Sequence, residues 1–247
     1  KLMLADAYGK RSPLFVLGES GSGKSSFIRA GLLPHLLNYG NETNNNVKEI
    51  LPSAFHGEIY DGIVDYIVKS FPILGNNPVL EDLHNGINVG YNFKHLKYAI
   101  DSAYKDVELI LFFDQLEEIF SDSLITEAER LRTFLLLKGL SEINSIQLIF
   151  SMRSDFYDRF TRYPDFGYIK NSSAVVDIPK VSFEDITEIV EIPAQKANLK
   201  WEINDKGIKL SKQIAKEAFE LGQLPLIEFG LSELYNACKY TEILTYE

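Results

Sequence analysis

The residues of this chain with the clearest chemistry form a glycine-rich octapeptide, Gly18-Glu-Ser-Gly-Ser-Gly-Lys-Ser25. The pattern G-x-x-x-x-G-K-[ST] predicts a loop whose backbone N–H groups point inward at phosphate oxygens. Lys24 is expected to reach the β- and γ-phosphates of a nucleotide, and the Ser25 hydroxyl is expected to bind Mg²⁺. The predicted nucleotide contacts in this loop are Gly18, Glu19, Ser20, Gly21, Ser22, Gly23, Lys24, Ser25 and Ser26.

The octapeptide stands between a predicted strand and a predicted helix. The apolar run Leu14–Leu17 precedes it, and a helical segment from Ser25 to about Leu37 follows it. A strand, a glycine loop and a helix in this order are the setting in which the pattern binds phosphate, because the start of the helix adds the positive end of its dipole. The sequence therefore predicts a nucleotide-phosphate site at residues 18–26.

A second candidate is Asp114, which directly follows the apolar segment Leu109–Phe113. Alongside such a phosphate loop, a carboxylate at the end of a neighbouring strand holds Mg²⁺ through its water shell. Asp114 is therefore the expected Mg²⁺ partner of Ser25. Either Glu117 or Glu118 could polarise an attacking water, and Glu117 is the candidate catalytic base. Their alternative role is to stabilise the N-terminus of the next helix through its dipole.

Arg153 follows a further apolar segment, Ile146–Ser151. An arginine just past a strand end lies on the rim where a nucleotide binds, and it can contact a γ-phosphate through two N–H groups. The alternative for Arg153 is a salt bridge with Asp155 or Asp158. The predicted catalytic residues are Lys24, Asp114, Glu117 and Arg153, and the predicted metal ligands are Ser25 and Asp114.

The elements that must position these residues alternate between strands and helices. Strands are predicted at five apolar segments: Leu14–Leu17, Val47–Leu51, Leu109–Phe113, Ile146–Ser151 and Ala174–Ile178. Most of these are continuously apolar, which is typical of a parallel sheet covered on both faces. We expect a three-layer α/β phosphate-loop fold with a five-stranded parallel sheet over residues 1–180. Residues 181–247 are expected to form a small helical subdomain.

Helix starts are predicted by side chains that cap an N-terminus or fix its first turn: Thr126 with Glu129, Ser182 with Asp185, and Pro225. A further helix is expected over Asp205–Leu221, and no strand pattern is found after Pro179. The apolar stripe of the helix that begins after Thr126 is expected to be Leu131, Phe134 and Leu135.

The composition excludes several classes of protein. The net charge is −10 and no basic face stands out, which argues against nucleic-acid binding. No apolar run approaches the roughly 20 residues that a membrane helix needs, and no signal peptide is visible. The single cysteine, Cys238, excludes an internal disulfide and fits a reducing compartment. A cytoplasmic protein without membrane contact is therefore expected.

Several segments together resemble the STAND NTPases, which are signal-transduction ATPases related to AAA+ and NB-ARC proteins. The likeness is closest to the bacterial novel STAND group and covers residues 12 to 236. It is carried by Gly18–Pro34, Asp114–Phe120, Arg153–Tyr157, Glu191–Ala194 and Leu224–Leu234. This combination is far more specific than the phosphate loop alone.

The resemblance implies a switch that rests with ADP, exchanges it for ATP and then forms a homo-oligomer. A fused sensor domain that meets a trigger, expected to be a protein, starts this exchange, and the oligomer activates a fused effector domain. Antiphage defence is the common use in bacteria. The resemblance further implies ATP or ADP with Mg²⁺ as cofactors and makes Arg153 the sensor-1 arginine. It also makes Pro225, in Gly222-Gln-Leu-Pro225, the proline that packs on adenine.

The chain departs from the family pattern in ways that bear on activity. Residues 1–12 lack the Phe-Phe-Gly-Arg-like segment that helps to clasp adenine in the family, and no winged-helix domain follows residue 247. A fragment of a longer multidomain protein is therefore expected. Gln115 stands where many ATPases carry Glu or Asp, which suggests slow hydrolysis. The alternatives are a constitutive ATPase or kinase, and a nucleotide-stabilised scaffold without hydrolysis.

Overall fold

Five parallel strands in the order β2-β3-β4-β1-β5 build the central sheet. They are β1 (Leu14–Gly18), β2 (Asn46–Ile50), β3 (Leu109–Phe113), β4 (Ile146–Arg153) and β5 (Ala174–Asp177). The computed structural model describes residues 12–38, 46–74, 89–104, 109–221, 224–238 and 243–245. Each strand matches a predicted segment to within two residues at either end, so the predicted α/β fold with a five-stranded parallel sheet is confirmed.

The chain divides into two units by its internal contacts. The first comprises residues 1–18 and 24–177, and the second comprises residues 19–23 and 178–247. The domain boundary between residues 180 and 181 stays a prediction. None of the described helices is both long enough and apolar enough to cross a membrane.

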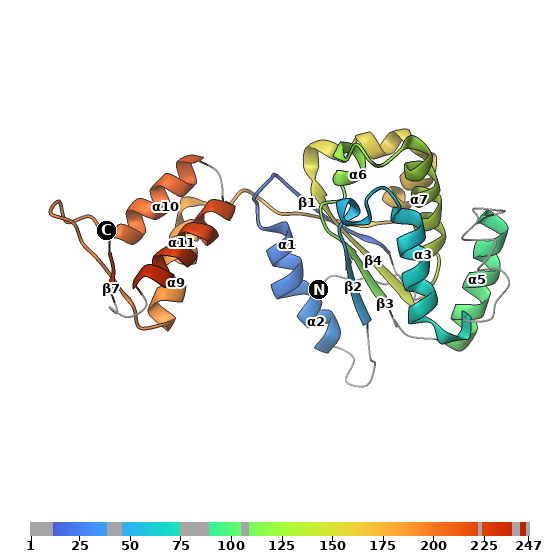
Figure 1. The fold of residues 1–247 in the computed structure, drawn as a ribbon, viewed down its shortest axis with the longest axis horizontal. Coiled ribbons are helices and arrows are strands. Elements are labelled where there is room, and N and C mark those ends of the chain that lie inside the picture. The colour runs from blue at the N-terminus through green and yellow to red at the C-terminus, as the bar shows by residue number, and fades with distance from the viewer. Residues whose placement is uncertain are drawn as a thin grey trace. The chain divides into compact units, whose positions relative to one another are not determined.

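Helices cover both faces of the sheet in the first unit. The run after β1 consists of α1 (Lys24–Ser26), a π-helical turn at Phe27–Leu32 and α2 (Leu33–Asn38), and it lies on the opposite side of the sheet from α3 and α7 (Figure 1). The other helices among the described residues of this unit are α3 (Ile59–Ser70), α5 (Val89–Ala103), α6 (Glu118–Ser121), α7 (Glu127–Leu140) and α8 (Pro164–Asn171). Four short 3₁₀ turns join them at Pro52–Phe55, Pro72–Leu74, Ser154–Phe156 and Arg159–Arg162.

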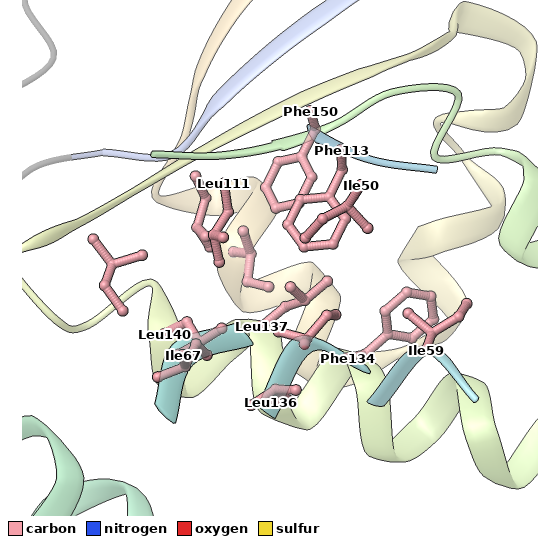
Figure 2. Packing of buried hydrophobic residues seen from close by; sticks show 14 of the residues in the cluster. Ile50, Ile59, Ile67, Leu111, Phe113, Phe134, Leu136, Leu137, Leu140 and Phe150 are labelled. Atoms are coloured by element: carbon pink, nitrogen blue, oxygen red, sulfur yellow. The ribbon is translucent and has the colours of Figure 1, made fainter. Parts of the chain in front are cut away.

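The main core lies between the sheet and helices α3, α5, α7 and α8. Alternate side chains of the strands point into it, among them Leu111, Phe113 and Phe150, and they meet Phe134 and Leu137 of α7 (Figure 2). Each such side chain contributes roughly 1.5–3 kcal/mol when it is fully removed from water. This rigid layer fixes the strand ends, from which the candidate site is built.

The predicted apolar stripe of α7 is wrong at Leu131. Its side chain is 51% exposed, whereas Phe134, Leu136, Leu137 and Leu140 are buried. The run Leu135-Leu136-Leu137 is apolar on more than one side of the helix, so α7 could bury either of two faces. The contacts with the sheet and with α3, α5 and α8 bury the face that carries Leu136, Leu137 and Leu140. The predicted cap is present, because the Thr126 hydroxyl accepts a hydrogen bond from the Glu129 N–H.

The second unit contains α9 (Phe183–Lys196), α10 (Leu210–Leu221) and α11 (Leu224–Cys238). The capping box predicted at Ser182 and Asp185 is present in both directions at the start of α9. Ile186, Val190, Ala215, Ala218 and Ile227 form a small core from the three helices.

Two expectations for this unit are wrong. The helix predicted over Asp205–Leu221 begins only at Leu210, because the Asn204 side chain accepts hydrogen bonds from the backbone N–H groups of Lys206 and Ile208 and holds a turn there. Strands also occur after Pro179, since β6 (Lys200–Trp201) pairs in parallel with β7 (Ile243–Leu244). Two-residue strands are too short to give a periodic signal in the sequence.

Candidate functional site

The carboxyl ends of β1, β3 and β4 meet at one edge of the sheet. Gly18, the last residue of β1, lies in register with Arg153, the last residue of β4. Phe113 ends β3, and Asp114 follows it directly. Three of the segments singled out in the sequence therefore reach the same edge, which is where open parallel sheets bind their ligands.

The loop after β1 has the backbone shape that phosphate binding needs. Gly21 and Gly23 have φ angles of 74° and 85°, a region that residues with a side chain rarely adopt. The Ser22 N–H donates to the Glu19 carbonyl at 3.3 Å and closes a turn. The Ser22 hydroxyl is buried and has no hydrogen-bond partner among the described residues. A buried unpaired hydroxyl is costly, and a phosphate oxygen in the loop would satisfy it.

Lys24 is buried at the base of this loop, with 8% of its surface exposed. Its Nζ donates to the Gly18 carbonyl at 3.1 Å. Burial lowers the pKa of Lys24, while the nearby carboxylates of Glu117 and Asp114 oppose this shift. A buried ammonium group that is short of solvation is well placed to bind an anion, since phosphate oxygens would replace its lost water.

Asp114 is the most heavily bonded carboxylate of the site and is only 1% exposed. Its Oδ1 accepts hydrogen bonds from the Ser25 hydroxyl at 2.7 Å, from the Gln115 N–H at 3.1 Å and from the Ser151 hydroxyl. Its Oδ2 accepts a charge-assisted bond from Arg29 Nη2 at 2.8 Å. The two predicted metal ligands, Ser25 and Asp114, are thus in direct contact although 89 residues separate them.

Ser151 and Arg29 are functional candidates that sequence reasoning missed. Ser151 is fully buried in β4, and a polar residue between the apolar Phe150 and Met152 is a signal that could have been used. Arg29 carries no such signal. Its contact with Asp114 depends on the π-helical turn, which no periodicity in the sequence indicates.

The structure separates the two candidate bases. The Glu118 carboxylate accepts hydrogen bonds from the Ser53 N–H and hydroxyl, at 3.2 and 2.6 Å, and is thereby bound to the turn after β2. The Glu117 carboxylate instead accepts from the Arg153 N–H at 3.2 Å. Burial raises the pKa of Glu117, although its hydrogen bonds and the charges of Lys24 and Arg153 oppose the shift. Of the two glutamates, Glu117 is therefore the one that lies at the end of β4 and whose charge acts on Lys24.

Arg153 forms the salt bridge that the sequence offered as its alternative role. Its Nε and Nη2 contact the two carboxylate oxygens of Asp155 at 3.1 and 2.9 Å. Asp158 pairs with Lys170 at 3.8 Å instead. The arginine is partly exposed at the rim, so its contact with a γ-phosphate stays a prediction.

The remaining predicted contacts differ in what the structure says of them. The Glu19 carboxylate pairs with Lys180 Nζ at 2.8 Å, and both side chains are largely exposed. Ser20 is exposed and Ser26 belongs to α1. Pro225 is the second residue of α11, but its side chain lies outside the described residues, as do Gly222 and Gln223. The adenine contact of Pro225 therefore stays a prediction.

A nucleotide with Mg²⁺ fits this set of groups. Ser22, Lys24 and the glycine backbone offer donors to phosphate, while Ser25 and Asp114 offer the hydroxyl and carboxylate oxygens that Mg²⁺ prefers. The described residues contain no cluster of three or more His, Cys, Asp or Glu side chains that could hold a metal by itself. One carboxylate and one hydroxyl are a typical protein contribution to a Mg²⁺ ion whose other ligands are phosphate oxygens and waters.

Comparisons with known proteins agree with the geometry. The family model described as novel STAND NTPase 1 matches residues 3–247. No curated protein matches the chain. Similar solved structures include the Aeropyrum pernix ORC1 protein in complex with DNA, at 14% identity and a TM-score of 0.60, with 96% of this chain and 57% of that chain covered.

Two bacterial structures are also similar. Domain III of the replication initiation protein DnaA from Thermotoga maritima has 14% identity and a TM-score of 0.57, with 95% of this chain and 80% of that chain covered. A Thermotoga maritima RuvB variant has 10% identity and a TM-score of 0.52, with 96% and 60% covered. The chain spans less than two thirds of the ORC1 and RuvB chains. At these identities the likeness shows a shared fold.

Proposed function

Because this chain belongs to the novel STAND NTPase 1 family, we propose that its nucleotide-binding module is an ATP-dependent switch that hydrolyses ATP slowly. The observation that carries the proposal is the contact between the Ser25 hydroxyl and Asp114 beneath a phosphate loop whose Ser22 hydroxyl is unpaired. ATP and ADP are the proposed nucleotides, and Mg²⁺ is the proposed metal.

Each residue has a proposed role in binding or in the reaction. Lys24 and the loop N–H groups bind the β- and γ-phosphates, and Ser25 and Asp114 hold Mg²⁺, which neutralises phosphate charge when bound. Glu117 accepts the proton of the attacking water. Arg153 exchanges Asp155 for the γ-phosphate and so distinguishes ATP from ADP.

Two features favour slow turnover. Gln115 follows Asp114 in a left-handed backbone conformation, with a φ of 52°, and offers no carboxylate where many ATPases carry one. The Glu117 carboxylate already accepts a hydrogen bond from the Arg153 N–H. It must keep or give up this bond when it accepts the proton of the attacking water. A slow reaction suits a switch whose state must last.

The wider role of the protein is proposed from the family likeness. In the longer cytoplasmic protein, ATP would drive assembly into a homo-oligomer after a fused sensor domain meets a protein trigger. The oligomer would activate a fused effector domain, and antiphage defence is the proposed use. The acidic charge of the chain gives no support to nucleic-acid binding by this part.

The nucleotide content of the purified chain tests the proposed function first. We expect an adenine nucleotide at about one per chain, since a site with millimolar cellular ligand and micromolar affinity is filled in the cell. The measurement is chromatography and mass analysis of the nucleotide released on denaturation. ADP would identify the resting state. A guanine nucleotide would contradict the assignment, and the Lys24→Ala variant, expected to be empty, is the control.

The two adjacent carboxylates provide a matched pair for testing the catalytic base. Glu117→Gln is expected to lower ATP hydrolysis by about 100-fold, because a general base contributes roughly 10²- to 10⁴-fold. Glu118→Gln is expected to leave hydrolysis within about threefold of wild type, since Glu118 serves the Ser53 turn. Phosphate release with saturating Mg·ATP is the measurement. Equal effects of the two substitutions would contradict the assignment of Glu117 as the base, and two near-neutral effects would show that neither carboxylate is the base.

A further inference from the structure

Arg29 bridges two carboxylates that come from different strands. Its Nη2 contacts Asp114 Oδ2 at 2.8 Å, and its Nε lies 3.0 and 3.3 Å from the two carboxylate oxygens of Glu49 on β2. Nη2 also contacts Glu49 Oε1. One guanidinium group therefore sits between a buried carboxylate at the end of β3 and a partly exposed one near the end of β2.

Because of this contact, the two carboxylate oxygens of Asp114 bind different partners. Oδ1 faces the hydroxyls of Ser25 and Ser151, and Oδ2 faces Arg29. A carboxylate can rotate about its terminal bond, which has a broad, nearly twofold energy profile. A charge-assisted bond to one oxygen opposes this rotation, because such bonds are roughly twice as strong as neutral ones. Arg29 thus keeps Oδ1 beside Ser25.

The π-helical turn at Phe27–Leu32 presents Arg29 for this contact. The Leu33 N–H donates to the Ile28 carbonyl five residues earlier, which widens the turn by one residue relative to an α-helix. Ile28 and Leu32 remain buried, while Arg29 reaches toward Glu49 and Asp114. Short π-helical turns inside helices are rare and are frequently found at functional sites.

We propose that Arg29 is the positioning residue of the Mg²⁺ site. It holds Asp114 Oδ2 so that Oδ1 stays with Ser25, and its fixed charge keeps a second cation from binding between Asp114 and Glu49. This inference rests on the proposed function, in which Ser25 and Asp114 bind Mg²⁺ together with the nucleotide.

An ordinary surface salt bridge does not account for the arrangement. Exposed pairs contribute little to stability, because water and salt screen both charges. Here Asp114 is 1% exposed and needs a cation, and without Arg29 two carboxylates would lie close together. Arg132 offers a comparison within the same chain, since it also contacts two carboxylates, Asp61 and Glu129, neither of which is a candidate site residue.

The test is the gain in ADP affinity that Mg²⁺ provides, measured with a fluorescent ADP analogue in excess Mg²⁺ and in EDTA. Arg29→Ala is expected to reduce this gain about tenfold, because partners of metal ligands typically change metal affinity by 10- to 100-fold. Its affinity in EDTA should stay within about threefold of wild type, since Lys24 and the loop are untouched. Arg29→Lys should recover only part of the gain, because an ammonium group cannot bridge both carboxylates as a guanidinium does.

Two further variants complete the design. Arg132→Ala should lower thermal stability and leave unchanged the gain in ADP affinity that Mg²⁺ provides. Glu49→Gln should reduce the gain by about twofold to threefold, because Arg29 loses its anchor but keeps Asp114. If Arg29→Ala does not fold, Arg29→Lys and Glu49→Gln decide the question.

The outcomes separate the two proposals. An unchanged or larger Mg²⁺ gain in Arg29→Ala, or in both other variants if it does not fold, would overturn the role of Arg29 and leave nucleotide binding intact. A wild-type protein that binds neither ADP nor ATP, or binds them without any effect of Mg²⁺, would overturn the proposed function itself.

Discussion

Replacing Lys24 by Ala is expected to weaken ATP binding by at least about 100-fold, which corresponds to roughly 2.7 kcal/mol. Each hydrogen bond from a charged group contributes about 1.5–3 kcal/mol, and the buried ammonium group is placed to make more than one with the phosphates. Titration with a fluorescent ATP analogue measures the loss. Because burial already disfavours the charged form of Lys24, its removal should change the melting temperature without nucleotide by less than about 4 °C.

Lys138→Ala is the matched control for this prediction. Lys138 also forms an ion pair, with Asp165 at 2.6 Å, but neither residue belongs to the candidate site. Its substitution should leave ATP affinity within about twofold of wild type. Full ATP affinity in Lys24→Ala would contradict both the phosphate-loop assignment and the proposed switch.

The Asp114→Asn substitution is expected to reduce Mg²⁺-dependent ATP hydrolysis by about 100- to 1000-fold, as the loss of one preorganised electrostatic group does in other enzymes. The amide oxygen can still accept from Ser25 and Ser151, but the amide nitrogen then faces Arg29 with donor against donor. We therefore also expect the free energy of unfolding to fall by about 1–3 kcal/mol. Phosphate release under single-turnover conditions and urea denaturation measure the two effects.

The Ser151→Ala variant separates the effect of losing the Asp114 charge from the effect of losing a hydrogen bond to Asp114. This variant removes one donor to Oδ1 and keeps the carboxylate, Arg29 and Ser25 in place. A loss of stability with hydrolysis within about tenfold of wild type is expected, since one hydrogen bond to a charged group contributes about 1.5–3 kcal/mol. Unchanged hydrolysis in Asp114→Asn would show that this carboxylate does not serve the metal.

The sheet and the central pair of the site could be predicted because each depends on a local rule. Continuously apolar segments indicate buried parallel strands, and most of the five strands were found in this way, although β2 also carries Lys48 and Glu49. A carboxylate directly after such a strand must lie at the same edge as the loop after β1, and Asp114 and Ser25 are indeed in contact there, while their role as Mg²⁺ ligands stays a prediction. The capping box at the start of α9 follows from two residues three positions apart, Ser182 and Asp185.

The features that were missed depend on contacts between distant segments or on fine backbone geometry. Glu117 and Glu118 are neighbours in the sequence, but their carboxylates bind different partners. Only the structure shows that Glu118 accepts a hydrogen bond from Ser53, whereas Glu117 accepts one from the Arg153 N–H. Arg29 meets Asp114 through a π-helical turn that has no sequence period of its own. The late start of α10 results from one asparagine side chain that competes with the helix for backbone donors.

The open space around Gly23 has a consequence for what this loop can tolerate. A methyl group added in the L configuration would meet no atom within 4 Å, so a larger residue is not excluded by crowding. What excludes it is the positive φ of 85°, which the sterics of an L-residue disfavour within its own backbone. With respect to the neighbouring atoms of the chain, the limit on this position is therefore one of chirality and not of volume.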